Sequence, residues 1–152
     1  MPTAKLKEYL DENHVKYVTI RHSPAYAAHE IAASAHIPAK EVAKTVILKV
    51  DGRMVMAVLP ASHRVNLIDV RDALGAGNVE LACEDDFKSI FPGCALGAMP
   101  PFGNLYGMDV LVARRLTEDK DIAFNAGTHT ELVKLPYNDF ERLVHPQVLK
   151  FT

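Results

Sequence analysis

The chain has 152 residues, of which 49% are hydrophobic, and this size and composition predict one globular domain covering residues 1–152. Its formal net charge of −2 at pH 7 argues against a protein that coats nucleic acid nonspecifically, because such binding needs a basic surface that displaces counterions. A local binding pocket for one part of a nucleic acid is still compatible with this charge.

The first residues form a charged amphipathic pattern, without the apolar run of a signal peptide or the long uncharged stretch of a membrane span. We therefore expect a cytoplasmic protein. The two cysteines, Cys83 and Cys94, form no CxxC pair and are too few for a disulfide framework, so both are expected to be reduced.

The first part of the chain predicts a helix, a strand and then a β-hairpin. Apolar and aromatic spacing indicates a helix at 5–12, a strand at 17–20 and a short alanine-rich helix at 27–35. Two apolar runs, 44–50 and 54–59, flank Asp51-Gly52, and this dipeptide favours a tight hairpin turn. We expect this hairpin to lie at the centre of the sheet.

The second part predicts further helices and strands in alternation. Asn66 can cap a helix at 67–74, which Gly75 can end. Asn138 and Glu141 resemble a capping box for a final helix through Leu143. The other expected elements are strands at 79–82, 109–113, 122–125 and 130–135 and a helix at 84–90. The mixture predicts an α+β fold with a mixed sheet and helices packed around it.

The segment 92–107 contains four of the eight glycines and three of the nine prolines. Glycine lets the backbone approach a ligand closely, and proline fixes the shape of a loop, so this segment can form a rigid binding wall. A long surface connection with ordinary turns explains the same composition equally well.

Two single residues are candidates for a binding site. Lys44 begins an apolar strand and can hold a phosphate, although an ordinary solvated lysine fits the same position. His129 follows Asn125-Ala126-Gly127 in a turn between two expected strands, where it lines a pocket or is simply exposed.

The sequence lacks the motifs of several common kinds of catalysis. His22, His29 and His36 recur at a spacing of seven, but prolines interrupt any single helix that would carry all three, so we expect no metal. None of the serines lies in a GxSxG elbow, which disfavours covalent serine catalysis. Cys94 has no signature of a Cys-His pair, and we interpret it as a loop-packing residue.

Four segments, taken in chain order, resemble the YbaK/ProX-type aminoacyl-tRNA editing deacylases, which are similar to the editing domain of some prolyl-tRNA synthetases. The segments are 42–48, 57–61, 97–103 and 125–127. The most specific parts are a lysine that opens a hydrophobic strand, here Lys44, and a later GxxxP loop, here Gly97 to Pro101.

The resemblance implies a compact α+β domain with a twisted, barrel-like mixed sheet surrounded by helices. It implies hydrolysis of the ester between a small wrong amino acid of the alanine, cysteine or serine class and transfer RNA, with proline tRNA as the expected substrate. It also implies no cofactor, no metal and no protein nucleophile. The expected partners are the acceptor end of mischarged tRNA and, as a further candidate, an aminoacyl-tRNA synthetase, with neither DNA nor membrane.

The resemblance also assigns roles to residues of this chain. Lys44 would bind the phosphate or sugar of the terminal adenosine, and the backbone of 97–101 would position the ester and the attacking water. The catalytic set is then Lys44, Gly97, Ala98, Met99, Pro100 and Pro101. The substrate-binding set is Thr45, Phe102, Gly103, Gly127 and His129. Met99, Phe102 and His129 are the expected walls of a small amino-acid pocket.

An aminoacyl ester is already activated, so positioned water and fixed dipoles can supply much of its hydrolysis without a catalytic side-chain base. Two other functions fit the same residues. One is a noncatalytic module that binds aminoacyl-tRNA, a synthetase or a small ligand. The other is a hydrolase of another small ester or amide, which a substrate panel would distinguish.

Overall fold

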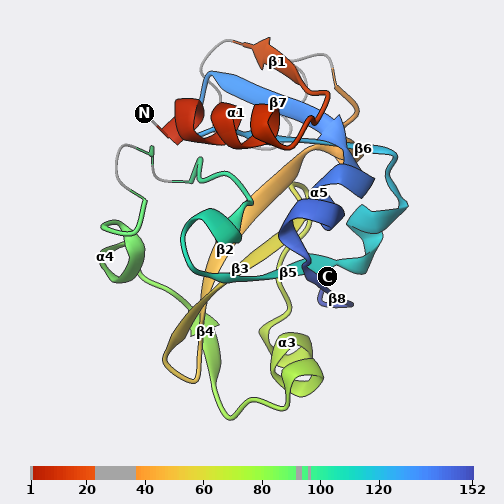
Figure 1. The fold of residues 1–152 in the computed structure, drawn as a ribbon. Helices are drawn as coiled ribbons and strands as arrows, with labels where there is room; N and C mark the ends of the chain where they lie inside the picture. The colour runs from red at the N-terminus through yellow and green to blue at the C-terminus, as the bar shows by residue number, and fades with distance from the viewer. Residues whose placement is uncertain (1, 23–36, 92–93, 96) are drawn as a thin grey trace.

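The computed structural model describes residues 2–22, 37–91, 94–95 and 97–152 (Figure 1). The short helix expected at 27–35 lies outside these residues. The α-helices are α1 (Pro2–Glu12), α3 (Leu67–Leu74), α4 (Glu84–Phe87) and α5 (Tyr137–Val144). The strands are β1 (Val18–Arg21), β2 (Ala43–Val50), β3 (Arg53–Pro60), β4 (Val79–Leu81), β5 (Asp109–Ala113), β6 (Asp121–Asn125), β7 (Glu131–Pro136) and β8 (Gln147–Leu149). Three 3-10 turns are η1 (Ala39–Glu41), η2 (Gly103–Leu105) and η3 (Arg114–Glu118).

A five-stranded sheet in the order β4-β2-β3-β5-β8 carries the expected hairpin at its centre (Figure 1). Asp51 and Gly52 both have positive φ angles, 47° and 86°. Positive φ at both residues is the backbone conformation of the tight hairpin turn that this dipeptide favours. β2 pairs antiparallel with β3 and β4, whereas β3, β5 and β8 run parallel to one another. The expected α+β fold with a mixed sheet is thus confirmed.

A second, three-stranded sheet has the order β1-β7-β6 and is antiparallel. Among the described residues, one parallel bridge, between Val42 and Ala123, joins it to the larger sheet. The two sheets do not close into one, so the expected barrel-like description is too strong. Helix α1 lies along the smaller sheet, and the Lys7 ammonium forms an ion pair with Glu131 of β7 at 2.7 Å (Figure 1).

The central strands β3 and β5 of the larger sheet are buried on both faces, as their nearly continuous apolar sequences require. Alternate residues of β3 belong to different clusters, with Met56 and Val58 packed in the main core. Val55, Ala57 and Leu59 face a second cluster that includes Val70 of α3.

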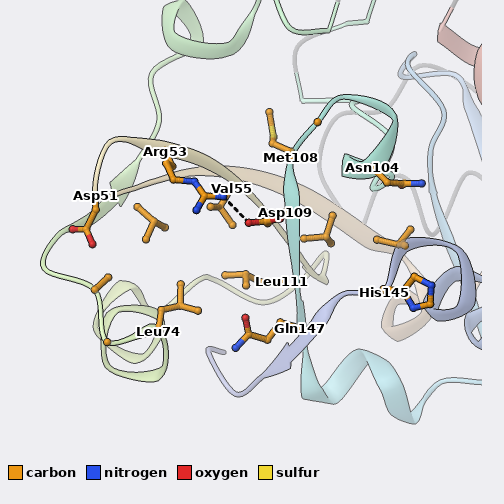
Figure 2. Close-up of a pocket in the computed structure, with 16 residues that line it drawn as sticks. Asp51, Arg53, Val55, Leu74, Asn104, Met108, Asp109, Leu111, His145 and Gln147 are labelled. Carbon is orange, nitrogen blue, oxygen red and sulfur yellow. Dashed lines mark hydrogen bonds and ion pairs between the residues drawn. The ribbon is translucent and has the colours of Figure 1, made fainter.

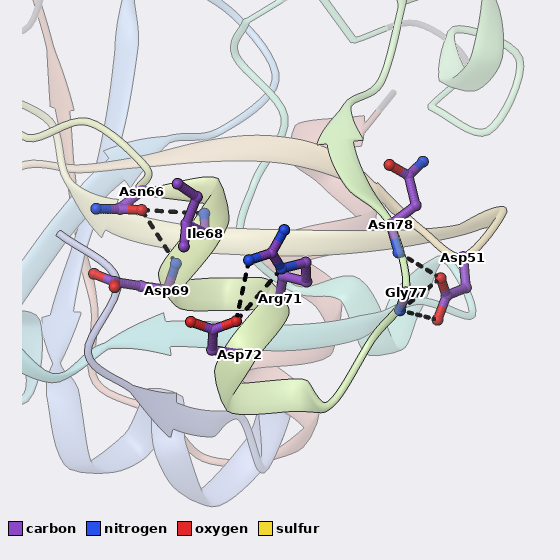
Figure 3. Close-up of polar contacts among 8 residues, drawn as sticks. All are labelled: Asp51, Asn66, Ile68, Asp69, Arg71, Asp72, Gly77 and Asn78. Atoms are coloured by element: carbon purple, nitrogen blue, oxygen red, sulfur yellow. Dashed lines mark hydrogen bonds and ion pairs between the residues drawn. The ribbon is translucent and has the colours of Figure 1, made fainter.

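Helix α3 begins and ends where the sequence predicts. The Asn66 side chain accepts hydrogen bonds from the N–H groups of Ile68 and Asp69, both at 3.1 Å (Figure 3). Gly75 ends the helix with φ +64°. Beyond the helix, the Asp51 carboxylate accepts the N–H groups of Gly77 and Asn78, which ties the hairpin turn to the start of β4 (Figure 3).

Three details differ from the sequence-based expectations. Helix α5 is capped by Pro136 without a side-chain hydrogen bond, and Asn138 lies inside the helix, so the capping box is wrong. Helix α4 ends at Phe87 instead of reaching Ile90. Strand β8 was not predicted. Across the described ranges, no helix is both long and apolar enough to cross a membrane.

Candidate functional site

The GxxxP loop lies against the turn between β6 and β7. The Gly127 N–H donates to the Ala98 carbonyl oxygen at 2.8 Å, and the Ala95 N–H donates to the Gly127 carbonyl oxygen at 2.9 Å. Gly127 has φ +102°, a backbone conformation that favours glycine. Two segments that the sequence separates by about thirty residues therefore form one backbone surface.

Gly97 brings His129 into the same site. Gly97 has φ +83°, and a Cβ placed on it would lie 3.6 Å from Cε1 of the His129 ring. The imidazole, which is half-buried, thus stands directly beside the loop backbone. A Cβ at Gly97 would therefore be in ordinary van der Waals contact with the ring.

The loop offers backbone donors that no part of the described chain uses. The N–H groups of Gly97 and Met99 form no hydrogen bond with any described residue. Pro100 and Pro101 are buried and have no N–H, so they hold the loop shape without adding donors. Donors at fixed positions are suited to stabilising a developing oxyanion.

Lys44 is half-buried near the beginning of β2, opposite Leu59 of β3. Burial lowers the pKa of its ammonium group below the ordinary value, and the nearby Arg64 cation lowers that pKa further. Both effects disfavour the charged form, and the attraction of an anion bound at this point would offset both.

Asn125 is a further candidate for the site, one that the sequence-based assignment did not include. Lys44 lies two residues past Val42 and Asn125 two past Ala123, so alternation along the bridged strands places both on one side of the junction. The Asn125 Oδ1 atom is buried, and it accepts no hydrogen bond from the described residues. A buried acceptor of this kind costs about 1–3 kcal/mol unless a donor reaches it. Its place in the 125–127 motif was the available signal.

Three residues of the predicted substrate-binding set, Phe102, Gly103 and Thr45, pack inside the protein. The Phe102 ring is fully buried and packs against Tyr9, Phe124 and Phe140 at centroid distances of 6.1, 5.6 and 5.6 Å. Phe102 is therefore a core residue and not an exposed pocket wall. Gly103 packs so closely on β5 that a Cβ would lie 2.6 Å from Cγ2 of Val110. Thr45 is buried on the face of β2 opposite Lys44.

Cys94 is half-buried beside the loop and forms no disulfide. Burial raises the pKa of its thiol, which disfavours the thiolate that a nucleophile requires. No group of three histidine, cysteine or acidic side chains converges in a metal-binding arrangement within the described ranges.

A separate groove of about 770 Å³ lies at the other end of the larger sheet (Figure 2). The hairpin turn, the end of α3 and the start of β5 line it, and an ion pair at 2.7 Å joins Arg53 to Asp109 (Figure 2). Neither Lys44 nor residues 97–101 line this groove, so it is distinct from the candidate site.

The aminoacyl-tRNA editing domain family matches residues 22–143, and the chain belongs to this family. The proline–tRNA ligase of Bacillus mycoides is 32% identical over 77 residues, which are 51% of this chain and 13% of the ligase. The corresponding ligase of Bacillus cytotoxicus is 31% identical over 85 residues, 56% of this chain and 15% of the ligase. The chain thus matches only a small part of each ligase.

A similar fold occurs in a crystal structure described as a candidate trans-editing enzyme for prolyl-tRNA synthetase. It superposes with a TM-score of 0.84 over 99% of this chain and 96% of that one, at 17% identity. At this identity the likeness establishes the fold.

Proposed function

We propose that this protein is a cytoplasmic deacylase that removes a small, wrongly attached amino acid from transfer RNA, with proline tRNA as its substrate. The observation that carries the proposal is the joined backbone surface of the GxxxP loop and Gly127, with the His129 ring beside Gly97. Membership of the editing family and the partial match to two proline–tRNA ligases support the same reaction.

The proposed chemistry uses a water molecule held against an activated ester. The unused N–H groups of Gly97 and Met99 stabilise negative charge on the carbonyl oxygen as water attacks. Removing one comparable donor in other hydrolases costs about 2.7–4 kcal/mol of transition-state stabilisation. The ester oxygen leaves with the ribose, and the two products are the free amino acid and the uncharged tRNA.

Lys44 and Asn125 hold the two ends of the substrate in this proposal. The Lys44 ammonium binds a phosphate or ribose oxygen of the terminal adenosine through a charge-assisted contact. The Asn125 Oδ1 atom accepts a hydrogen bond from the α-ammonium group of the amino acid, which satisfies an otherwise unpaired buried acceptor.

The test is multiple-turnover release of labelled alanine, serine or cysteine from mischarged proline tRNA, with and without a chelator. We expect turnover in both conditions, because the proposed chemistry needs only water and oriented dipoles. Binding without turnover would instead indicate a noncatalytic module, and equal rates on unrelated small esters would indicate a general esterase.

Asn125→Ala should lose about tenfold or more in kcat/KM in this assay, because a hydrogen bond to a charged group contributes about 1.5–3 kcal/mol. Asn104→Ala is the matched control, since Asn104 is exposed and bonds only the Tyr9 hydroxyl among the described residues. Equal rates in the two variants would remove Asn125 from the site.

A further inference from the structure

One edge of the larger sheet collects positive charge because three of its strands are parallel. β3, β5 and β8 run in the same direction, with Val58 opposite Val112 and Ala113 opposite Leu149. Their carboxyl ends therefore meet at one edge. The residues that follow these ends are basic, namely His63 and Arg64 after β3, Arg114 and Arg115 after β5, and Lys150 after β8.

The same edge contains Lys44. β2 runs antiparallel to β3, and Ala43 pairs with Pro60, so Lys44 lies one residue inside the edge from which Arg64 continues. Burial and then the Arg64 cation lower the pKa of Lys44, so the two positive charges repel each other. The candidate site and this edge are thus electrostatically continuous.

A cleft of about 240 Å³ opens in the middle of this edge. The residues that line it are His63, Arg114, Arg115, Glu118, Lys150 and Thr152. Glu118 is 3.5 Å from Nε of Arg115, in an ion pair that both side chains expose to solvent. Across the described part of the chain, Arg64, Arg114 and Lys150 have no carboxylate within ion-pair distance.

We propose that this basic edge, defined as Arg64, Arg114, Arg115 and Lys150, binds the phosphate backbone of the tRNA acceptor stem while the aminoacyl end reaches Lys44. The inference rests on the proposed function, because the stem must continue from the terminal nucleotide that Lys44 holds. All four side chains are exposed, and they give a local cationic surface to a chain whose net charge is −2. Such a surface suits a regularly spaced polyanion.

The test compares two substrates on two double variants. The substrates are alanylated proline tRNA and an alanylated CCA trinucleotide, which has no stem. The variants are Arg114→Gln with Arg115→Gln, and a matched control that removes two cations elsewhere, Arg53→Gln with Lys88→Gln. Arg53 lies at the opposite end of β3 and Lys88 follows α4, and both are exposed members of ion pairs.

We expect the Arg114/Arg115 variant to raise KM for the tRNA by about tenfold and to leave kcat/KM for the trinucleotide unchanged. The slope of log kcat/KM against log salt should become shallower by about one to two, since roughly one counterion is released per phosphate contact. The control should behave as the wild type on both substrates. Equal behaviour of the two variants, or an equal loss on both substrates, would overturn the proposal.

Binding of uncharged tRNA separates this inference from the proposed function. If the wild type hydrolyses neither substrate but the Arg114/Arg115 variant alone binds uncharged tRNA more weakly, the deacylase proposal fails and the basic edge stands. Displacement of the tRNA by polyglutamate as readily as by an RNA duplex of the same charge would overturn the assignment to RNA.

Discussion

At the scale of single residues, Lys44 is unusual because burial and a neighbouring cation act on it in the same direction. Partial burial removes water from its ammonium group, and Arg64 adds repulsion. Coulomb interactions near a protein surface are stronger than in bulk water, so an arriving phosphate gains more here than at an isolated surface lysine. Binding of an anion beside the Lys44 ammonium is therefore favourable.

Lys44→Ala should lower kcat/KM for deacylation by about tenfold to a hundredfold, because a charge-assisted hydrogen bond contributes about 1.5–3 kcal/mol. The fold should survive, since a half-exposed lysine contributes little to the core. Lys49→Ala is the matched control, because Lys49 lies on the same strand and pairs with Asp86 at 3.4 Å. Wild-type rates in Lys44→Ala, with Lys49→Ala unchanged, would show that Lys44 is not in the site.

The lowered pKa of Lys44 predicts an alkaline limit to activity. As pH rises through a pKa below 10.5, the ammonium becomes neutral and its contact with phosphate is lost. We expect kcat/KM, corrected for spontaneous ester hydrolysis, to turn downward in that range. Lys44→Arg keeps its charge, so its profile should lack the downturn even if it is slower. Parallel profiles for the two proteins would contradict this assignment.

At the scale of elements, the helices and strands whose ends are marked by capping or turn residues could be predicted from the sequence. Asn66 and Gly75 mark α3 at both ends, and Asp51-Gly52 marks the central hairpin, because each motif acts through hydrogen bonds or φ angles of its own segment. β8 carries no such signal, since its three residues pair only with β5 and depend on a partner that is distant in the chain. Pro136 caps α5 through the backbone alone, so the capping-box pattern two residues later was misleading.

Gly97→Val should impair deacylation strongly, because it adds a branched side chain between the loop backbone and the His129 ring. The substitution also strains a backbone with φ +83°. Gly107→Val controls for the strain, because Gly107 has φ +68° and a Cβ added there would meet nothing within 4 Å. Thermal unfolding should shift similarly in the two variants, while turnover should fall only in Gly97→Val. Loss of turnover in both would assign the effect to the fold.

At the scale of the whole molecule, the candidate site could be predicted in parts but not as an arrangement. Motif order singled out Lys44 and the GxxxP loop, and the turn between two expected strands pointed to His129. The proximity of Gly97 to His129 depends on how the loop docks on the smaller sheet, and the basic edge depends on three strands being parallel. Both arrangements bring together residues that are far apart in the chain, and the spacing of motifs along one sequence does not predict such contacts.

The assembled site should prefer small amino acids. The His129 ring lies beside Gly97, 3.6 Å from the position of an added Cβ. In the proposed pocket the amino-acid side chain lies next to these two residues, where a phenylalanine ring would crowd them. One methylene is worth about 1–3 kcal/mol in such pockets, and we expect alanine, serine and cysteine to exceed phenylalanine by at least about tenfold in kcat/KM. The measurement uses one tRNA charged with each in turn. Phenylalanine released as fast as alanine would contradict a small pocket.

The pairing of α1 and β1 with β7 has a consequence for biosynthesis. Lys7 meets Glu131, 124 residues later in the chain, and β1 hydrogen-bonds along β7. At about 5–20 residues per second, a ribosome needs roughly 6–25 s to synthesise that interval. During this time the N-terminal helix and strand lack the strand that completes their sheet. The smaller sheet is therefore completed late in synthesis. Until then, the edge of β1 that later binds β7 is unpaired and can form hydrogen bonds with a wrong strand.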